Sequence, residues 1–505
     1  MVRLPDIIDW KQYLECYRGL LIAPAGHGKT TAIADCLLQC PDQSCHLVLT
    51  HTHAGIASLR SKFHQKCVPH DRYQLETITG FAQRLVLSIL GSSSLPTEDD
   101  ATYFDSAINK CYELMQSDVI QLIIKNSYNS IFVDEYQDCT IDQHNMIMSL
   151  SDKLPLHLLG DPLQGIFSFE SKRLVDFDKD FFFFQRFYLL NYPWRWDKNN
   201  IALGKLILQL RKSIEAKLPV ILKTNNATNF IIEQYDPNCN QYGPEYLRWL
   251  RNIFRKYDSE SLLVIYPSYR ERNTHGQSLL RGDLSDRIKL KSLIDYTNTF
   301  NIVDAIDSSE YYSCAKQIDK YLLNCREGKK IKRIARLYDI LENLHTNISS
   351  LNKWICKNEN RFIPRTKENA QASIQIIALY DEFEHSMNIN SLIRLIDYIF
   401  NLKDMKCHYK GLYYELRHAA NIAATESISL FEAMRMIKNR TRHIGRKIEG
   451  RCIGTTLLTK GLEFDTVIIY NAHKFEDSKN FYVAISRACR RLVIITCSSK
   501  LEFKD

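Results

Sequence analysis

The chain has 505 residues, of which 45% are hydrophobic and 25% are charged, and its formal net charge is +8. This composition is ordinary for a globular protein of about two to four domains. No apolar run reaches the length of about eighteen residues that a membrane-spanning helix needs, and the N-terminal residues lack the apolar stretch of a signal peptide. We therefore expect a soluble, cytoplasmic protein that spans no membrane. The modest basic excess is compatible with contacts to nucleic-acid phosphates but does not establish them.

The fifteen cysteines are scattered and form no Cys-x-x-Cys pair. The tightest group comprises Cys36, Cys40 and Cys45, with His46, His51 and His53 close behind. A metal cluster at this group is one interpretation. Reduced thiols in a cytosolic protein are the other, and the scattered spacing favours them.

The first 190 residues alternate short apolar runs with helical patterns, which predicts a parallel α/β sheet. The expected strands comprise residues 19–23, 46–50, 131–133 and 157–159, and a helix is expected over residues 31–39. The last two strands run into acidic residues at their C-terminal ends. In open α/β sheets, this end of the strands is where ligands bind.

A second α/β unit begins near Phe181 and is interrupted. Its strands are expected at residues 262–266, 455–458, 467–470 and 492–496. Between about residues 301 and 447 helical patterns dominate, with an apolar stripe formed by Leu392, Leu395, Ile396 and Ile399. Ser429 and Glu432 form a capping box before another helix. Residues 91–96, Gly-Ser-Ser-Ser-Leu-Pro, indicate a small insertion in the first unit.

A phosphate-binding loop is predicted at residues 23–30, Ala-Pro-Ala-Gly-His-Gly-Lys-Thr, because this segment follows a strand and opens a helix. Backbone N–H groups and the helix N-terminus favour phosphate there. Lys29 is expected to reach the β- and γ-phosphates, and the Thr30 hydroxyl to bind Mg²⁺. Ala23 replaces the usual first glycine. The residues expected to hold the nucleotide are Ala25, Gly26, His27, Gly28, Lys29, Thr30 and Thr31.

Two adjacent carboxylates follow the strand at residues 131–133. Asp134 is expected to hold Mg²⁺, and Glu135 to activate the attacking water. An acidic strand-to-helix turn with only a structural role is the alternative, but such a turn does not require a phosphate loop upstream.

These two motifs resemble motifs I and II of UvrD/Rep-type superfamily 1 DNA helicases. The other motifs follow in the family's order. Residues 49–54 resemble motif Ia, residues 77–82 the next element, residues 160–167 motif III, residues 191–195 motif IV, residues 458–464 motif V and residues 482–488 motif VI.

The resemblance implies an α/β fold of two RecA-like P-loop domains with parallel sheets. It also implies a small insertion in the first domain and a mainly helical insertion in the second. The expected boundaries are residues 1–190 for the first domain, with its insertion at about 86–126, residues 191–300 and 448–505 for the second domain, and residues 301–447 for the helical insertion.

The resemblance also implies roles for single residues in the use of ATP and Mg²⁺. Gln164 would sense the γ-phosphate, and Arg195 and Arg487 would act as arginine fingers from the second domain. Surface ion pairs are the structural alternative for each arginine. Residues implied in binding the nucleoside are Glu463 at the ribose, Trp194 or the competing Tyr192 at the base, and Gln12, whose short spacing leaves the base preference open to GTP or deoxynucleotides.

A single-strand track needs aromatic platforms for bases and donors for phosphates. The resemblance places this track at Thr50, His51, Thr52, Thr77, Phe81, Phe167, Phe169 and Thr459. His51 stands where relatives carry phenylalanine, and Glu170 where they carry arginine, which weakens that edge. For each aromatic residue, burial in the core is the alternative. Basic residues also gather over 329–336 and 435–451, where a solvated helix face competes with a surface for duplex DNA or a partner.

The function expected from these motifs is an ATP-dependent translocase or helicase on single-stranded or tailed duplex DNA, moving 3′ to 5′ as the family does. The alternative is a DNA-stimulated NTPase that senses DNA for a nuclease-containing anti-phage defence complex. The compact layout, without room for a fused nuclease after motif VI, resembles the helicase subunit of the Gabija anti-phage system, which pairs with an OLD-type nuclease. A P-loop kinase is a third interpretation, but it leaves Gln164 and Arg487 unexplained.

Overall fold

The computed structural model describes residues 8–96, 100, 102–166, 173–272, 278–295, 299–303, 309–329, 331–366, 369–403, 405, 407–444 and 448–504. The chain divides into two compact units. The first unit comprises Met1–Arg281, Gly445–Glu449 and Thr455–Asp505, and the second comprises Gly282–Ile444 and Gly450–Gly454. None of the helices in the described part of the chain combines the length and apolar character that a membrane span requires.

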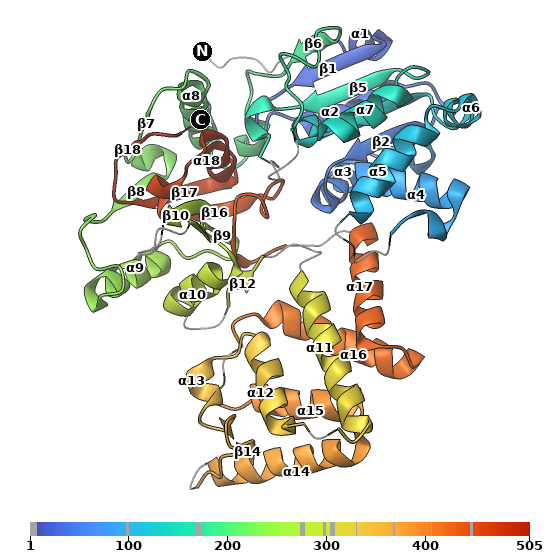
Figure 1. The fold of residues 1–505 in the computed structure, drawn as a ribbon. Coiled ribbons are helices and arrows are strands. Elements are labelled where there is room, and N and C mark those ends of the chain that lie inside the picture. The colour runs from blue at the N-terminus through green and yellow to red at the C-terminus, as the bar shows by residue number, and fades with distance from the viewer. Residues whose placement is uncertain are drawn as a thin grey trace. The chain divides into compact units, whose positions relative to one another are not determined.

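The first six-stranded sheet has the order β3-β2-β4-β5-β1-β6. Its strands β1, β2, β5 and β6 are labelled in Figure 1. Every neighbouring pair runs parallel. Its strands are β1 (Arg18–Ile22), β2 (His46–Thr50), β3 (Tyr73–Thr77), β4 (Ser130–Val133), β5 (Leu156–Gly160) and β6 (Gln185–Tyr188). The four strands predicted in this region are therefore present. The two edge strands, β3 and β6, were not predicted, because their residues are mostly half-exposed and polar.

Helices cover both faces of this sheet because its central strands are apolar on both sides. On one face Leu21 and Val48 pack against α2 (Lys29–Gln39) and α3 (His53–Gln65). On the other face Leu20 and Leu47 join the core that the remaining helices cover. The helices of that second core are α4 (Ile78–Leu90), α5 (Tyr103–Leu114), α6 (Asp118–Ser127) and α7 (Ile141–Leu150), and α1 (Trp10–Glu15) precedes β1. The region expected as a small insertion thus contributes α5 and α6 to this core.

The second six-stranded sheet has the order β12-β15-β9-β16-β17-β8. Its strands are β8 (Phe230–Gln234), β9 (Leu262–Ile265), β12 (Asn301–Ile302), β15 (Arg451–Gly454), β16 (Phe464–Ile469) and β17 (Ala488–Thr496). The pairings β12–β15, β9–β16, β16–β17 and β17–β8 are parallel. The α/β class with two parallel sheets, predicted from the motifs, is therefore confirmed. The helices that accompany these strands in the first unit are α8 (Ile201–Glu215), α9 (Pro244–Lys256) and α18 (Ser478–Ile485).

One strand prediction was wrong. The strand ends at Gly454, and a turn over residues 456–461 follows Thr455. The Thr455 hydroxyl accepts a hydrogen bond from the Leu458 amide at 3.4 Å, and the Thr455 carbonyl accepts one from the Thr459 hydroxyl at 2.8 Å. Such local threonine bonds compete with a strand ladder.

Short antiparallel ribbons complete the first unit. They pair β7 (Val220–Ile221) with β18 (Lys500–Leu501), and β10 (Tyr269–Arg272) with β11 (Ser278–Arg281).

The second unit is mainly helical. Its helices are α10 (Leu284–Ile294), α11 (Ser309–Arg326), α12 (Arg333–Asn343), α13 (Ile348–Leu351), α14 (Ala370–Ser386), α15 (Ile389–Phe400), α16 (Lys410–Glu426) and α17 (Leu430–Ile444), with one ribbon of β13 (Ile355–Cys356) and β14 (Arg361–Phe362). The stripe predicted on α15 is confirmed, because all four of its apolar side chains are buried. The capping box is confirmed too, because Ser429 and Glu432 each bond the other's backbone N–H at 3.1 Å.

Candidate nucleotide site

The phosphate loop joins β1 to α2, and its glycines are required by geometry. Gly26 has φ +71° and Gly28 has φ +98°, in the left-handed region that favours glycine. A Cβ on Gly26 would lie 2.7 Å from Cβ of Arg195 and 2.8 Å from Cζ3 of Trp196. The Gly26 carbonyl accepts a hydrogen bond from the Arg195 amide at 3.0 Å. The loop is therefore fitted closely against the segment that carries Arg195.

The start of α2 presents positive charge to the loop. Lys29 is only 6% exposed, and its ammonium donates to the Ala23 carbonyl at 2.9 Å. The first backbone N–H groups of a helix have no partner within the helix, so this end favours a phosphate. The Thr30 hydroxyl lies 3.4 Å from Oδ2 of Asp134. Two oxygen ligands of the kind that Mg²⁺ prefers thus lie beside the phosphate cradle.

Asp134 and Glu135 are adjacent acids at the end of β4. Burial, and then the charge of Glu135, raise the pKa of Asp134. Burial also opposes ionisation of Glu135, but the charges of Lys29 and Lys460 outweigh it and lower the pKa of Glu135. A bound divalent cation would relieve the repulsion that Asp134 experiences. The pair can therefore provide one metal ligand and one ionised base.

Gln164 and Arg487 meet within the site. Gln164 ends the 3₁₀ helix η4 (Pro162–Gln164), while Arg487 lies between α18 and β17. Nη2 of Arg487 donates to Oε1 of Gln164 at 3.3 Å. Arg487 is 1% exposed, and burial followed by the charge of Arg195 lowers its pKa to about 10. A buried guanidinium close to a second one is placed to receive an anion.

Arg195 lies in the 3₁₀ helix η5 (Trp194–Trp196) and already pairs with Glu463. Its Nε donates to Oε1 of Glu463 at 2.9 Å, and its Nη1 donates to the Ser486 carbonyl at 2.6 Å. The Arg195 charge lowers the pKa of Glu463. Glu463, implied to bind a ribose, therefore engages an arginine of the site.

A pocket of about 280 Å³ lies where these groups converge. The implied residues that line it are Ala25, Gly26, Gly28, Lys29, Thr30, Thr31, Thr52, Asp134, Glu135, Gln164, Trp194, Arg195, Glu463 and Arg487. Segments that precede or follow strands of both sheets thus contribute to one pocket.

Three residues expected at the nucleotide do not line this pocket. Gln12 is exposed on α1. Tyr192 donates its hydroxyl hydrogen bond to Asp197, and its ring lies 4.5 Å from that of Trp194, centroid to centroid. The His27 side chain is buried beside the Ala25 carbonyl at 2.9 Å, and burial lowers its pKa to about 4. Of the two candidates for the base, only Trp194 reaches the pocket.

Lys460 was not predicted from the sequence. It lines the pocket, and its ammonium donates to Asp138 and to the Gln164 carbonyl. Burial raises the pKa of Asp138 to about 7, against the opposing charge of Lys460. Its place beside Thr459, inside the motif V segment, was the available signal. The ion pair joins the motif II segment to the motif V segment.

The implied nucleic-acid residues are mostly covered. Thr50 is buried at the end of β2, Thr52 and Thr77 cap α3 and α4 through their hydroxyls, and the Thr459 hydroxyl donates to Thr455. Nε2 of His51 lies 3.2 Å from Oε1 of Gln143, and burial lowers the pKa of His51 to about 4. Phe81 is 0% exposed and packs in the core, which is the structural alternative for an aromatic residue. Phe167, Phe169 and Glu170 lie outside the described residues.

The metal-cluster interpretation of the cysteines gains no support. Across the described ranges, no three or more His, Cys, Asp or Glu side chains are grouped to hold a metal ion. Cys36 and Cys40 are buried as free thiols.

Comparison with known proteins finds helicase-related matches over parts of the chain. Residues 93–181 match the family described as UvrD/REP helicase N-terminal domain. The chain is 45% identical over 56 residues to Gabija protein GajB of Bacillus cereus (strain VD045), which is 11% of each chain. It is 31% identical over 150 residues to RecBCD enzyme subunit RecB of Buchnera aphidicola subsp. Schizaphis graminum (strain Sg), which is 26% of this chain and 13% of RecB. The matches thus span little more than a tenth of either relative. The resemblance to UvrD/Rep-type helicases predicted from the motifs is therefore confirmed, through a UvrD/REP helicase N-terminal domain match over residues 93–181 that contains Asp134, Glu135 and Gln164.

Proposed function

We propose that the chain hydrolyses ATP with Mg²⁺ at this pocket and couples hydrolysis to movement along single-stranded DNA. The observation that carries the proposal is the composition of the pocket. Lys29 and Glu135 follow strands of the first sheet, Lys460 and Arg487 lie on segments next to strands of the second, and Arg195 lies in η5 between β6 and α8. Hydrolysis at such a site depends on how closely the two sheets approach, which is what a motor requires.

The phosphate loop binds the β- and γ-phosphates through Lys29 and the first N–H groups of α2. The Thr30 hydroxyl and the Asp134 carboxylate would hold Mg²⁺, which supplies charge neutralisation at the phosphates when bound. Trp194, exposed beside Gly28, offers a face for the base. Glu463 is proposed for the ribose, with Arg195 holding its carboxylate.

Glu135 accepts the proton of the attacking water, because its lowered pKa keeps it ionised at neutral pH. Gln164 contacts the γ-phosphate, and Arg195 and Arg487 stabilise the charge that develops as the phosphoryl group transfers. Because Arg487 directly precedes β17 of the second sheet, the reaction would be sensitive to closure.

We further propose that the two sheets are the RecA-like domains of a helicase, over residues 1–190 and over residues 191–300 with 448–505. Residues 301–447 would be the helical insertion, except that β12 (Asn301–Ile302) at its start pairs with β15 in the second sheet. Single-stranded DNA would run past the segment that carries the half-buried His51 and Thr52, with the 3′-to-5′ direction implied by the resemblance. We place the protein in the cytoplasm.

The proposal is tested by phosphate release from ATP and Mg²⁺. Lys29→Ala and Glu135→Gln should each abolish hydrolysis, whereas Glu135→Gln should still bind nucleotide because the phosphate loop is intact. The exposed Lys198 offers a control, and Lys198→Ala should behave like the wild type. Hydrolysis that persists in Lys29→Ala would show that the activity belongs elsewhere.

A second candidate is an NTPase that senses DNA for a partner nuclease, such as an OLD-type nuclease, in anti-phage defence. The 45% identity to a 56-residue segment of a Gabija protein favours it. Failure of the isolated chain to unwind a tailed duplex, together with its co-purification with a nuclease, would support this candidate. Robust unwinding by the isolated chain would contradict it.

A further inference from the structure

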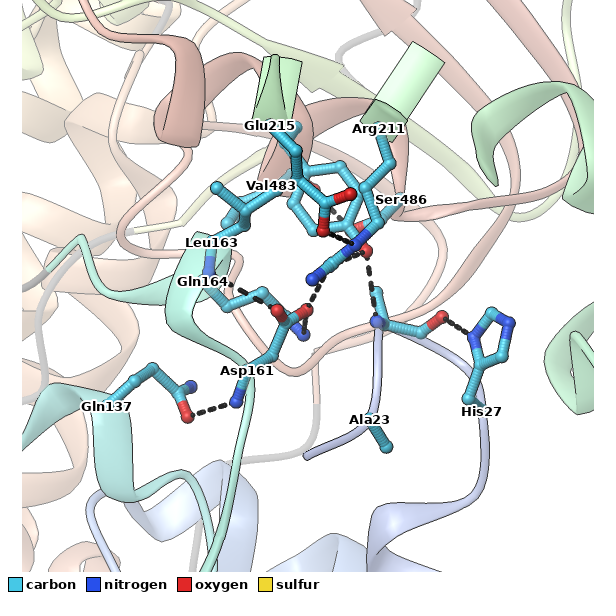
Figure 2. A network of polar contacts seen from close by, with 12 residues as sticks. Ala23, His27, Gln137, Asp161, Leu163, Gln164, Arg211, Glu215, Val483 and Ser486 are labelled. Atoms are coloured by element: carbon cyan, nitrogen blue, oxygen red, sulfur yellow. Dashed lines mark hydrogen bonds and ion pairs between the residues drawn. The ribbon is translucent and has the colours of Figure 1, made fainter. Parts of the chain in front are cut away.

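A buried polar network lies beside the pocket and connects the phosphate loop to two helices that accompany the second sheet. Asp161, directly after β5, is fully buried at its centre (Figure 2). Its Oδ2 accepts hydrogen bonds at 2.8 Å from Nε2 of Gln164 and at 2.8 Å from Nη1 of Arg211. Its backbone N–H donates to Oε1 of Gln137 at 2.9 Å. Asp161 therefore fixes the amide plane of Gln164, whose Oε1 faces Arg487.

Arg211 reaches this carboxylate from α8. Its side chain is 7% exposed, and its Nε also donates to Glu215 at 2.8 Å. In Figure 2 the Arg211 side chain extends from its helix toward Asp161. Removing the two charges of such a pair from water costs free energy. Their mutual attraction offsets this cost only when the remaining polar atoms of both groups are also hydrogen-bonded. Replacing a buried ion pair by apolar residues of similar volume is often neutral or stabilising, so a buried pair is weak evidence for a purely stabilising role.

Tyr482 of α18 receives two hydrogen bonds at its hydroxyl. Nη1 of Arg211 donates at 2.9 Å, and the backbone N–H of Ala25 donates at 3.1 Å. The Arg211 guanidinium also lies 5.0 Å from the centre of the Tyr482 ring. Burial, followed by the Asp161 charge, raises the pKa of Tyr482 to about 12, so the phenol stays neutral. One tyrosine of the second sheet's helix thus holds a backbone amide of the phosphate loop.

Asp161, Arg211 and Tyr482 do not line the pocket. They touch groups that do, namely Gln164 and Ala25. Their effect on a bound nucleotide is therefore indirect, and it runs along two branches. One branch passes from Arg211 through Asp161 to Gln164, and the other from Tyr482 to Ala25.

Resting on the ATPase proposed above, we infer that Asp161, Arg211 and Tyr482 form a positioning relay that ties the Gln164 amide and the phosphate-loop backbone to helices α8 and α18. The Gln164 branch sets the orientation of the group beside the γ-phosphate and acts on kcat. The Ala25 branch sets the conformation of the loop and acts on nucleotide affinity. A displacement of α8 or α18 then alters the nucleotide site without any contact to the nucleotide.

Nη1 of Arg211 bonds both Asp161 and Tyr482, so the two branches share this group, and two substitutions weight them differently. Tyr482→Phe removes one hydroxyl and keeps the ring, so fluorescently labelled ADP should bind about 3- to 10-fold more weakly, as the loss of one hydrogen bond implies, with a matching rise in KM for ATP. Arg211→Met leaves Asp161 without its cation and should lower kcat about tenfold or more. Arg211→Lys should restore part of this loss, because it returns the charge without the second donor. Tyr246→Phe is the matched control, since Tyr246 is a buried tyrosine of α9 whose hydroxyl lies 3.3 Å from that of Tyr470.

The outcomes distinguish this relay from the proposed activity. If the wild type hydrolyses ATP and Tyr482→Phe matches Tyr246→Phe in ADP binding, the relay is overturned while the ATPase stands. If the wild type binds ADP without hydrolysing ATP, the ATPase fails, and weaker ADP binding by Tyr482→Phe still supports the relay. A wild type that binds no ADP overturns both. Should Arg211→Met fail to fold, Tyr482→Phe carries the test alone.

Discussion

Nη2 of Arg487 lies 3.3 Å from Oε1 of Gln164, so an arginine that precedes β17 of the second sheet contacts a glutamine that follows β5 of the first. Neither side chain is exposed to bulk solvent. Both line the pocket that also contains Lys29 and Glu135. A group that enters this pocket therefore meets charges carried by both sheets.

Loss of the Arg487 guanidinium should affect catalysis far more than nucleotide binding. We expect Arg487→Ala to lower the kcat of ATP hydrolysis by about 10³-fold or more, the range known for arginine fingers. Steady-state phosphate release measures this. Arg490→Ala is the control, because Arg490 is an exposed neighbour that pairs with Asp465 at 3.3 Å. Equal kcat values for ATP hydrolysis in Arg487→Ala and Arg490→Ala would show that Arg487 takes no part in catalysis.

Gly26→Ala should abolish nucleotide binding. The new Cβ would lie 2.7 Å from Cβ of Arg195 at a residue with φ +71°, so both the loop and its neighbour must shift. Gly91→Ala separates strain from crowding, because Gly91 has φ +80° but, apart from its chain neighbours, no heavy atom lies within 4 Å of the position that a Cβ would take. Gly91 combines φ +80° with ψ 171°, a region that essentially only glycine adopts, so we expect Gly91→Ala to cost about 1 to 3 kcal/mol of unfolding free energy and to leave nucleotide binding unchanged. Titration with labelled ADP measures the affinity of each variant. Similar affinities in Gly26→Ala and Gly91→Ala would show that the close contact at Gly26 is not needed for nucleotide binding.

Lys460→Met should destabilise the first unit, because it leaves the Asp138 carboxyl buried without its cation. We expect a loss of about 3 kcal/mol in a denaturant titration. Combining it with Asp138→Asn should recover much of this loss, since no buried charge then remains. If the double variant Lys460→Met/Asp138→Asn were as unstable as Lys460→Met alone, the loss of stability would not come from the unpaired Asp138 charge.

Acid should weaken the fold through His157. Burial lowers its pKa to about 3, while the unfolded chain takes up a proton near its ordinary value of 6.5. The contribution of the neutral His157 side chain to the free energy of unfolding is therefore complete above about pH 6.5. It is lost at about 1.4 kcal/mol per pH unit as the pH falls toward 3. His157→Phe keeps a ring against Tyr13 and Phe132, whose centroids lie 5.1 and 4.9 Å away.

The melting temperatures of the His157→Phe variant and the wild type should consequently diverge between pH 7.5 and pH 5. The melting temperature of the variant should fall less than that of the wild type as the pH is lowered. His385→Gln, at an exposed position of α14, is the control and should follow the wild type. Parallel curves for wild type and His157→Phe would exclude His157 as a source of acid sensitivity.

The chemistry carried by contiguous residues could be predicted from the sequence. Lys29 and Thr30 follow a strand within one loop, and Asp134 ends another strand, so local order was enough to expect them near one another. The half-exposed edge strand β3 could not be predicted, because its residues give neither an apolar run nor a clear alternation. A turn follows Thr455 where the apolar neighbours suggested a strand, because the Thr455 and Thr459 hydroxyls form hydrogen bonds within this segment.

The roles of residues that depend on tertiary contacts could not be predicted from the sequence. Arg211 is one basic residue among several on an amphipathic helix, and only the fold places it on Asp161. Lys460 acquires its role because Asp138 is brought to it from 322 residues away in the chain. Likewise, the motif order implied a ribose contact for Glu463 but not its pairing with Arg195.

A nucleic-acid strand should control hydrolysis at the site built from both sheets. The most direct test measures ATP hydrolysis by the wild type with single-stranded DNA, tailed duplex DNA, RNA and no nucleic acid. We predict a many-fold stimulation by single-stranded DNA that disappears in Glu135→Gln. A rate that is the same with every nucleic acid and with none would contradict the account.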